Sequence, residues 1–186
     1  MARVVYSLGM SLDGYVEDES GGFEWSAPAE DVHRIANEHA REASAFLFGR
    51  RMYEMMEAYW PAAAERGDTP TVEAEFARAY VETPRVVFSD SLESVSDGAR
   101  LVRSADARAE VARLKEQPGG HLELGGPTLA ASLVDLIDEF RPWVSPVLVG
   151  AGKRFFPAPP EQLRLRLVES RTCSGGVLYL RYERAA

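Results

Sequence analysis

Residues 122–134, LELGGPTLAASLV, place a short apolar strand directly before the pattern of a helix. Gly125 and Gly126, followed by a proline, stand at the junction. Proline fits the first position of a helix, where its missing N–H is not needed, and glycine lets another group come close to the main chain. The free N–H groups of the first helical turn, those of Thr128 and Leu129, can bind an anion. The stretch therefore predicts either a plain strand-to-helix turn or a phosphate site.

Strand and helix patterns alternate on both sides of this stretch over the first two thirds of the chain. Apolar periodicity and turn residues predict strands at 3–10, 44–49, 85–89, 99–103 and 121–124, and helices at 28–42, 50–60, 72–80, 104–115 and 128–134. We expect Pro61 to help end the second helix and Ser104 to cap the fourth. Such alternation favours a parallel sheet.

The last third of the chain changes character, because no helix separates its final two strands. Strands are expected at 138–150, 163–172 and 177–184, and a Gly-Gly pair at 175–176 joins the last two as a hairpin. The sequence therefore predicts an α/β fold with one mixed sheet, mostly parallel with a C-terminal antiparallel hairpin and with helices on both faces. No linker divides the pattern, so we expect a single domain over residues 1–186.

The composition excludes several classes of protein. A net charge of −8 argues against binding to nucleic acid or to an anionic membrane as the main role. Cys173 is the one cysteine, so no internal disulfide and no cysteine zinc site can form. His33, His39 and His121 lack the spacing of metal ligands, so we expect surface or packing roles for them and no metal site. No segment reaches transmembrane length, and we expect a cytoplasmic protein.

Two further positions point to an anion at the strand ends. Arg50 and Arg51 follow a strand and fall in the first turn of a helix, where the helix dipole disfavours a cation by roughly 0.3–1 kcal/mol. Arginine at this place indicates either a bound anion or a side chain that points into solvent. Ser89 follows another strand and offers a hydroxyl. In a parallel sheet these residues and Gly126 share one edge, which suits a pyrophosphate and a ribose phosphate.

Five segments occur in an order along the chain that is itself informative. They are YSLGMSLDGYVED (6–18), FGRRMYE (48–54), VVFSDSL (86–92), LGGPTLAASLVD (124–135) and VSPVLVGAGKRFFP (144–157). Together they resemble the dihydrofolate reductase superfamily, and within it the bacterial proteins similar to the reductase domain of riboflavin biosynthesis. The resemblance covers nearly the whole chain. It implies a dihydrofolate-reductase-like fold, NADPH as cofactor, hydride transfer to a ring or carbonyl carbon, and a homodimer, because relatives of this type commonly pair.

Carried over by position, the resemblance also implies a set of residues that bind the cofactor at the strand ends. With the two neighbours Arg51 and Asp90 added, the set is Gly49, Arg50, Arg51, Ser89, Asp90, Gly125, Gly126, Thr128 and Leu129. Within this set Ser89 corresponds to a contact with the adenosine phosphate. The glycine junction corresponds to the cradle of the pyrophosphate.

The segment WSAPAED (25–31) resembles the family's Trp-x-x-Pro-x-acid pattern, in which the acid faces the substrate. The resemblance places Glu30 there, with Asp31 next to it, and places Asp13 in a mobile loop near the nicotinamide. These three carboxylates are the catalytic candidates. From the residues alone, Asp13 and Glu30 are most simply solvated loop acids, and Trp25 is either a lid over the core or a substrate contact.

Departures from the family pattern affect the choice of cofactor. Met52 replaces the usual threonine near the phosphates, and Asp90 stands where a second serine is common. A carboxylate opposes a ribose 2′-phosphate and favours NADH, whereas Arg50 attracts the phosphate. We expect NADPH to bind about tenfold more tightly than NADH. NADH binding remains possible, and Arg51 could offset the charge of Asp90 by pairing with it.

Two classes of function remain open. The first is an NAD(P)H-dependent reductase for a small ring or carbonyl substrate, pterin-like or similar to a riboflavin precursor. The second is a nucleotide-binding or assembly protein that keeps the fold without catalysis. A carboxylic acid with a raised pKa in the pocket would favour the first class. An occluded pocket beside the nicotinamide would favour the second.

Overall fold

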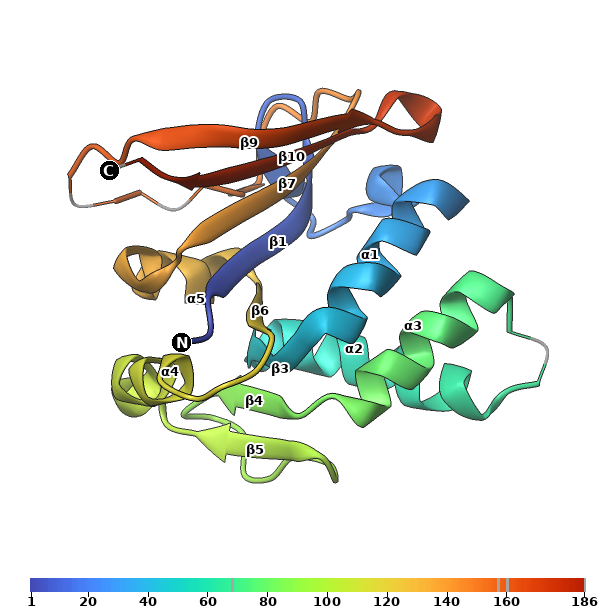
Figure 1. Cartoon of the computed structure of the whole chain (residues 1–186). Coiled ribbons are helices and arrows are strands. Elements are labelled where there is room, and N and C mark those ends of the chain that lie inside the picture. Colours follow the sequence, from blue (N-terminus) through green and yellow to red (C-terminus); the bar gives the residue numbers. More distant parts are fainter. Residues whose placement is uncertain (68, 157, 160, 186) are drawn as a thin grey trace.

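An eight-stranded sheet forms the centre of the computed structural model, which describes residues 1–67, 69–156, 158–159 and 161–185 (Figure 1). The strand order is β5-β4-β3-β6-β1-β7-β10-β9. Its strands are β1 (Val4–Ser11), β3 (Ala43–Gly49), β4 (Arg85–Phe88), β5 (Ala99–Val102), β6 (His121–Gly125), β7 (Glu139–Ser145), β9 (Leu165–Thr172) and β10 (Leu178–Arg184). Two short strands, β2 (Tyr15–Glu17) and β8 (Lys153–Arg154), form a separate antiparallel pair.

The strand directions confirm the predicted mixed sheet. β1 runs parallel to β6 and β7, β3 runs parallel to β4 and β6, and β4 runs parallel to β5. β10 is antiparallel to β7 and β9, so the predicted hairpin is also confirmed. Because parallel strands end at the same edge, the residues that follow β1, β3, β4 and β6 meet there.

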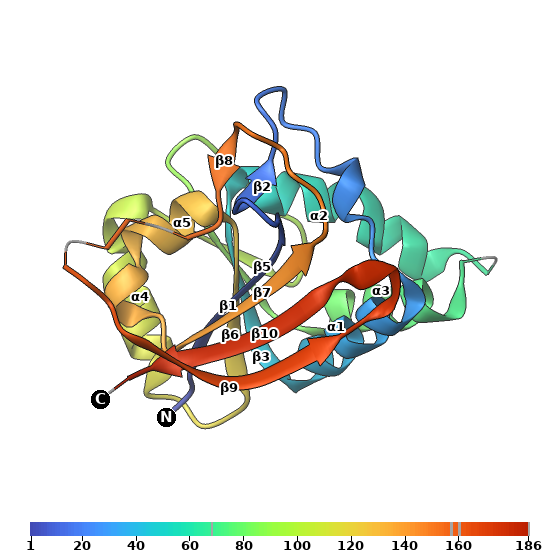
Figure 2. The same cartoon turned by 90° about the horizontal axis from the view of Figure 1, so that it is seen from above.

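Helices cover both faces of the sheet, as predicted (Figures 1 and 2). α1 (Glu30–Glu42), α2 (Arg50–Glu65) and α3 (Thr71–Glu82) lie against one face, and α4 (Ala107–Lys115) and α5 (Pro127–Ser132) lie against the other. The alternation of side chains along β3 explains both layers. Phe46 and Phe48 pack with residues of α1, α2 and α3, whereas Leu47 packs with residues of α4 and α5.

Two expectations about helix ends are wrong. Pro61 lies inside α2, which continues to Glu65. Proline removes one N–H and thus one helical bond, but it does so near the end of the helix, and the three alanines that follow it are strong helix formers. Ser104 does not cap α4 with its side chain; it begins a 3-10 turn, Ser104–Asp106, that leads into the helix.

Two other boundaries also differ from the prediction. β7 ends at Ser145, well before residue 150, because the chain turns tightly at Pro146, where the Val147 amide donates back to the Ser145 carbonyl at 2.8 Å. The helix expected at 128–134 is divided: α5 ends at Ser132, and a 3-10 turn, Val134–Leu136, follows. Pro157, which ends the family-like segment 144–157, lies outside the described residues.

Two further findings concern the helices and the possible metal ligands among the described residues. None of their helices has both the length and the apolar character that crossing a membrane requires. Within the same ranges no three His, Cys, Asp or Glu residues gather into a group that could hold a metal ion. The single domain over 1–186 stays a prediction.

Candidate functional site

A cavity of about 760 Å³ opens at the carboxyl edge of the parallel strands, where Leu8 and Gly9 of β1 line it. Most of the other lining residues fall into two groups, which we call the glycine half and the aromatic half, and which come from different parts of the fold. The glycine half consists of Gly49, Arg50, Arg51, Ser104, Ala107, Gly126, Pro127, Thr128, Leu129 and Ser132. The aromatic half consists of Phe23, Pro28, His33, Ala36, Met55, Met56, Trp60 and Phe76.

The two glycines at the end of β6, Gly125 in the strand and Gly126 after it, serve different purposes. Gly126 precedes α5 with φ of +101°, a conformation that L side chains rarely adopt. Gly125 allows close packing, since a Cβ there would crowd Cε1 of Phe48 at 3.0 Å. The first helical hydrogen bond of α5 runs from Ala130 N to Gly126 O, at 3.1 Å. The amides of Thr128 and Leu129 precede that bond, so they are left for another partner.

The start of α2 joins the glycine half to the loop after β4. Gly49 is the residue before the helix, in extended conformation. The exposed Arg50 donates from Nε to Glu54 Oε1 at 2.7 Å and from Nη1 to Ser91 Oγ at 3.0 Å. The guanidinium therefore spans from α2 to the β4 loop. This arrangement brings Arg50 and that loop together, as the sequence predicted.

Ser89 occupies its predicted place but its hydroxyl is engaged within its own turn. The side chain is buried, and its Oγ accepts hydrogen bonds from the amides of Ser91 and Leu92, both at 3.2 Å. The next residue, Asp90, is exposed, and its Oδ1 accepts the amide of Ser104 at 3.0 Å. Hydrogen bonding to Ser104 lowers the pKa of Asp90. Neither Ser89 nor Asp90 lines the cavity, and it is Ser91 that meets Arg50.

Arg51 does not pair with Asp90, so that expectation is wrong. Its guanidinium contacts Glu17 of β2 at 3.0 Å, and Lys153 of β8 contacts the same carboxylate at 3.3 Å. Arg51 is one position further along α2 than Arg50, about 100° around the helix, so it points to the β2–β8 pair and away from the β4 loop. All three of these side chains line the cavity, with the acid lying between two cations.

Asp13 fastens two loops together. Its carboxylate accepts the Ser11 hydroxyl at 2.6 Å, the Val149 amide at 3.1 Å and the Gly150 amide at 2.7 Å. The hydrogen bond from Ser11 is the largest of the effects that lower the pKa of Asp13 to about 2. The group is therefore ionised at neutral pH, and its oxygens are occupied by neighbouring donors. Asp13 does not line the cavity.

The two acids at the start of α1 also lie outside the cavity lining. Glu30 is exposed and pairs with Arg34 at 2.5 Å along the helix. Asp31 accepts the amide of Ser174 at 2.8 Å, in the turn between β9 and β10, and this hydrogen bond lowers the pKa of Asp31. Trp25 lies in the 3-10 turn before α1 and is likewise absent from the lining. The predicted acids are thus not gathered around the cavity.

The aromatic half contains the residues that sequence reasoning missed. His33 of α1 faces Trp60 and Phe76, with ring centroids 6.0 and 5.8 Å apart. The sequence predicts a surface or packing role for this histidine, and the structure places it in the cavity wall. Met55 and Met56 of α2 also line the cavity. Their helical spacing is the same as that of core residues, so nothing in the sequence separates a cavity wall from a core.

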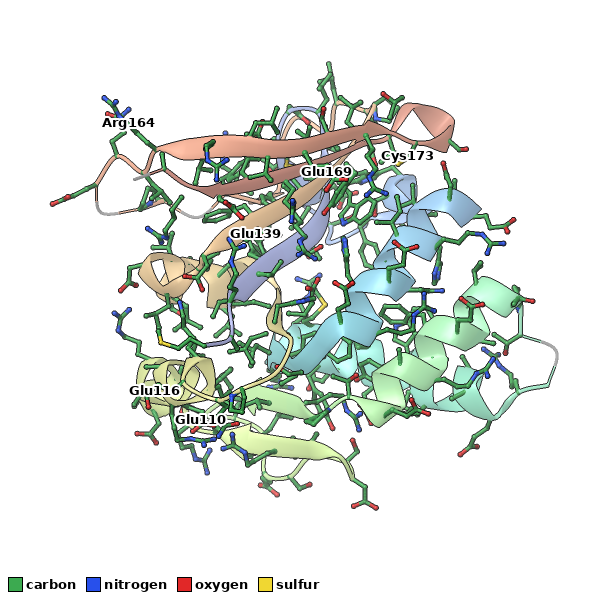
Figure 3. All side chains as sticks on the ribbon, in the orientation of Figure 1. Glu110, Glu116, Glu139, Arg164, Glu169 and Cys173 are labelled. Atoms are coloured by element: carbon green, nitrogen blue, oxygen red, sulfur yellow. The ribbon has the colours of Figure 1, made fainter. Side chains whose placement is uncertain are left out.

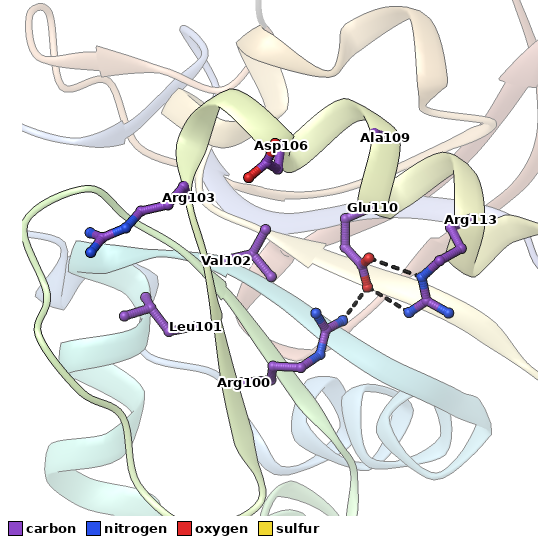
Figure 4. A pocket seen from close by; sticks show the side chains of 8 residues that line it. All are labelled: Arg100, Leu101, Val102, Arg103, Asp106, Ala109, Glu110 and Arg113. Carbon is purple, nitrogen blue, oxygen red and sulfur yellow. Dashed lines mark hydrogen bonds and ion pairs between the residues drawn. The ribbon is translucent and has the colours of Figure 1, made fainter.

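A second, shallower hollow of about 460 Å³ lies between β5 and α4 (Figure 4). Arg100, Arg103 and Arg113 lie around it, which resembles an anion site. However, the Glu110 carboxylate in the same hollow pairs with both Arg100 and Arg113. The carboxylate of Glu110 thus already engages two of the three guanidinium groups, and Asp106 adds a second acid to the lining, so we assign no ligand there.

A buried ion pair on β7 is a further concentration of charge, and neither partner lines the cavity. Glu139, labelled in Figure 3, is 1% exposed and accepts Nε of Arg141 at 2.5 Å. Arg3 lies 3.1 Å from the same carboxylate. The acid is satisfied by its cations, so this cluster is part of the structure of the sheet.

Comparison with known proteins finds chains of similar sequence and structures of similar fold. The chain is 27% identical to the uncharacterized protein YyaP of Bacillus subtilis (strain 168), over 97% of this chain and 94% of that one. A putative riboflavin biosynthesis protein from Shewanella sp. PV-4 has a similar structure, with a TM-score of 0.72, 22% identity and full coverage of both chains. Dihydrofolate reductase from Enterococcus faecalis, solved with NADP(H), has a TM-score of 0.64 and 12% identity over 99% of this chain and 97% of that one. The model of the RibD C-terminal domain matches residues 2–179, and the chain belongs to that family.

Proposed function

We propose that the protein is an NADPH-dependent reductase that transfers hydride to a small ring or carbonyl substrate. The observation that carries the proposal is the cavity itself, in which a glycine half and an aromatic half adjoin. A dinucleotide needs backbone donors and a guanidinium for its phosphates, and a flat substrate needs apolar walls beside the nicotinamide. One cavity offers both.

In this proposal the glycine half binds the two phosphate groups of the cofactor at different places. The free amides of Thr128 and Leu129 hold the pyrophosphate, and Gly126 leaves room for it. Arg50, held by Glu54 and Ser91, reaches the ribose phosphate and favours NADPH over NADH. When bound, NADPH supplies the hydride.

The aromatic half holds the acceptor and keeps water out. Its methionine and aromatic side chains give a flat molecule apolar contact on both sides. Glu17 is the one carboxylate among the described lining residues, and it forms ion pairs with Arg51 and Lys153. The three acids that the resemblance implies, Asp13, Glu30 and Asp31, all lie outside the lining, so the proposal assigns proton donation to none of them.

The position of these acids outside the cavity lining favours the second class of function, a nucleotide-binding protein without catalysis. The cavity is nevertheless open in its aromatic half, which such a protein does not need. Titration with NADPH and with NADH, followed by nicotinamide fluorescence, tests the binding that both classes share. We expect NADPH to bind about tenfold more tightly than NADH. Absence of binding at millimolar NADPH would refute both.

Turnover separates the two classes. The cofactor-saturated protein is offered pterins, flavin precursors and small carbonyl compounds, and the loss of absorbance at 340 nm is followed. Oxidation that depends on both protein and acceptor supports the reductase. Tight NADPH binding with no oxidation by any acceptor supports the protein without catalysis.

We further propose that the chain acts as a homodimer in the cytoplasm. β9 is an edge strand of the sheet, and Leu167 on it and Leu178 on β10 are 50% and 39% exposed. Apolar side chains beside an open strand edge favour cover by a second copy. Light scattering at micromolar concentration should give twice the mass of 20.5 kDa. A monomer would refute the dimer.

A further inference from the structure

His33 stands at the aromatic half of the cavity with a defined orientation. Its ring lies nearly perpendicular to Trp60 and Phe76, at interplanar angles of 75° and 86°. All three side chains line the cavity, and they come from three different helices. The imidazole therefore forms part of the same cavity wall as the two aromatic rings.

Asn37, one turn along α1, decides which nitrogen of His33 carries the proton. Asn37 is fully buried, and its Nδ2 donates to the carbonyl of Val72 at 2.8 Å and contacts Glu75 Oε2 at 3.3 Å. Both of those partners only accept hydrogen bonds, so the amide cannot be turned around without placing oxygen against oxygen. The Asn37 oxygen therefore faces Nδ1 of His33, at 3.1 Å.

An amide oxygen can only accept, so Nδ1 of His33 carries the hydrogen. In the neutral imidazole the other nitrogen, Nε2, then has a lone pair. Within the described residues Nε2 has no hydrogen-bond partner, and it is not among the side-chain atoms that are buried without one. The ring thus presents an acceptor at the cavity, held in one tautomer by a buried amide.

We infer that the aromatic half is a subsite for a flat, uncharged aromatic group that bears a hydrogen-bond donor, an O–H or N–H read by Nε2 of His33. This inference rests on the proposed function, since it names the class of acceptor that the reductase takes. Trp60, Phe76 and the methionines supply apolar contact for the ring. The aromatic half has no carboxylate among its described residues, so it offers no ion pair to offset the loss of water around a charged ring.

The inference is tested with two probes of nearly the same shape. 2-Naphthol can donate its O–H to Nε2, whereas 2-methoxynaphthalene cannot. Binding of each is measured by naphthalene fluorescence at pH 8.5, which favours neutral imidazole, without NADPH and again at saturating NADPH. We expect 2-naphthol to bind about fivefold more tightly, as one neutral hydrogen bond allows. His33→Phe keeps an aromatic wall and should abolish the difference, with the affinity for 2-methoxynaphthalene unchanged.

His121→Gln is the matched control, because His121 lies on β6 outside the cavity lining and should leave the fivefold difference intact. Equal binding of both probes by the unmutated protein overturns the inference. So does a difference that persists in His33→Phe, and so does binding of neither probe. If NADPH fails to bind while 2-naphthol behaves as expected, the proposed function fails and the subsite stands.

A second measurement does not depend on any ligand or variant. Long-range ¹H–¹⁵N correlation spectra resolve the imidazole nitrogens of the three histidines. At pH 8.5 we expect His33 as the Nδ1–H tautomer. An Nε2–H tautomer would overturn the inference, because the cavity would then be presented with a donor.

Discussion

The two halves of the cavity are built from different material. The glycine half is made of main chain and charged side chains at the ends of β3 and β6, and its shape follows from where parallel strands stop. The aromatic half is made of side chains from α1, α2 and α3, and its shape follows from how three helices pack. Where the ligand is held by main chain, a small added charge or side chain should weaken binding strongly. Where it is held by side chains, the loss of binding should follow the size and polarity of the side chain that is replaced.

The largest effect should come from a charge placed at the start of α2. Gly49 has an ordinary φ of −78°, and a Cβ there would lie 3.9 Å from Cβ of Leu129, which is normal contact. Aspartate is favoured at this position before a helix, so Gly49→Asp should fold with unchanged or higher Tm. Its carboxylate would oppose the pyrophosphate by about 3 kcal/mol, and NADPH affinity should fall about 100-fold in fluorescence titrations.

Gly49→Asn is the matched control, because it has nearly the same shape without the charge. It should weaken NADPH binding less than tenfold. Equal losses in the two variants would show that space, and not charge, limits the glycine half. Gly126 is a poorer position for this test, because φ of +101° strains any L side chain and mixes stability with binding.

A smaller effect is expected at the guanidinium that joins α2 to the β4 loop. Arg50→Ala removes the cation proposed to meet the 2′-phosphate, so NADPH should bind about tenfold more weakly while NADH changes less than twofold. The lost contacts with Glu54 and Ser91 are at the surface, so stability should hardly change. Equal losses for both cofactors would place Arg50 at the pyrophosphate, which the two share.

The glycine half was predictable because topology determines it. Once strands and helices alternate, the residues after β3 and β6 must share an edge, and Gly49, Arg50 and Gly126 do meet at one cavity. The direction of Asp31 was not predictable. It depends on the rotation of α1, which the burial of Val32 and Ala40 sets, and on Ser174, which is 143 positions away.

Similarly, no local pattern shows that Asp13 will meet the amides of residues 149 and 150.

Removal of the Asp13 carboxylate should lower the stability of the protein, by an amount that depends on pH. The pKa of Asp13 falls from 3.8 to about 2 on folding, so its contribution is complete above about pH 4 and is lost as pH falls toward 2. Asp13→Asn should lower Tm by about 3 °C at pH 7, and the gap should narrow below pH 4 in thermal melts. Unchanged Tm with lost turnover would instead support the catalytic role that the family resemblance implies.

The smallest effect concerns Asp90, a carboxylate in the β4 loop whose charge opposes the proposed phosphate contact. Arg51 does not neutralise it, because that guanidinium is held by Glu17. Two other features weaken it: the Ser104 amide donates to its Oδ1, and the Arg103 guanidinium, which donates to the Asp90 carbonyl at 3.0 Å, lies close by. The carboxylate is also exposed, so water and salt screen it.

Asp90→Ser should therefore raise the preference for NADPH over NADH less than threefold, and 0.5 M NaCl should remove most of that gain. The measurement is a pair of titrations, one with each cofactor, at low and at high salt. A tenfold or larger gain would mean that the carboxylate meets the phosphate directly. The β4 loop would then belong to the glycine half as fully as the start of α2 does, and the choice of cofactor would depend on Asp90 as much as on Arg50.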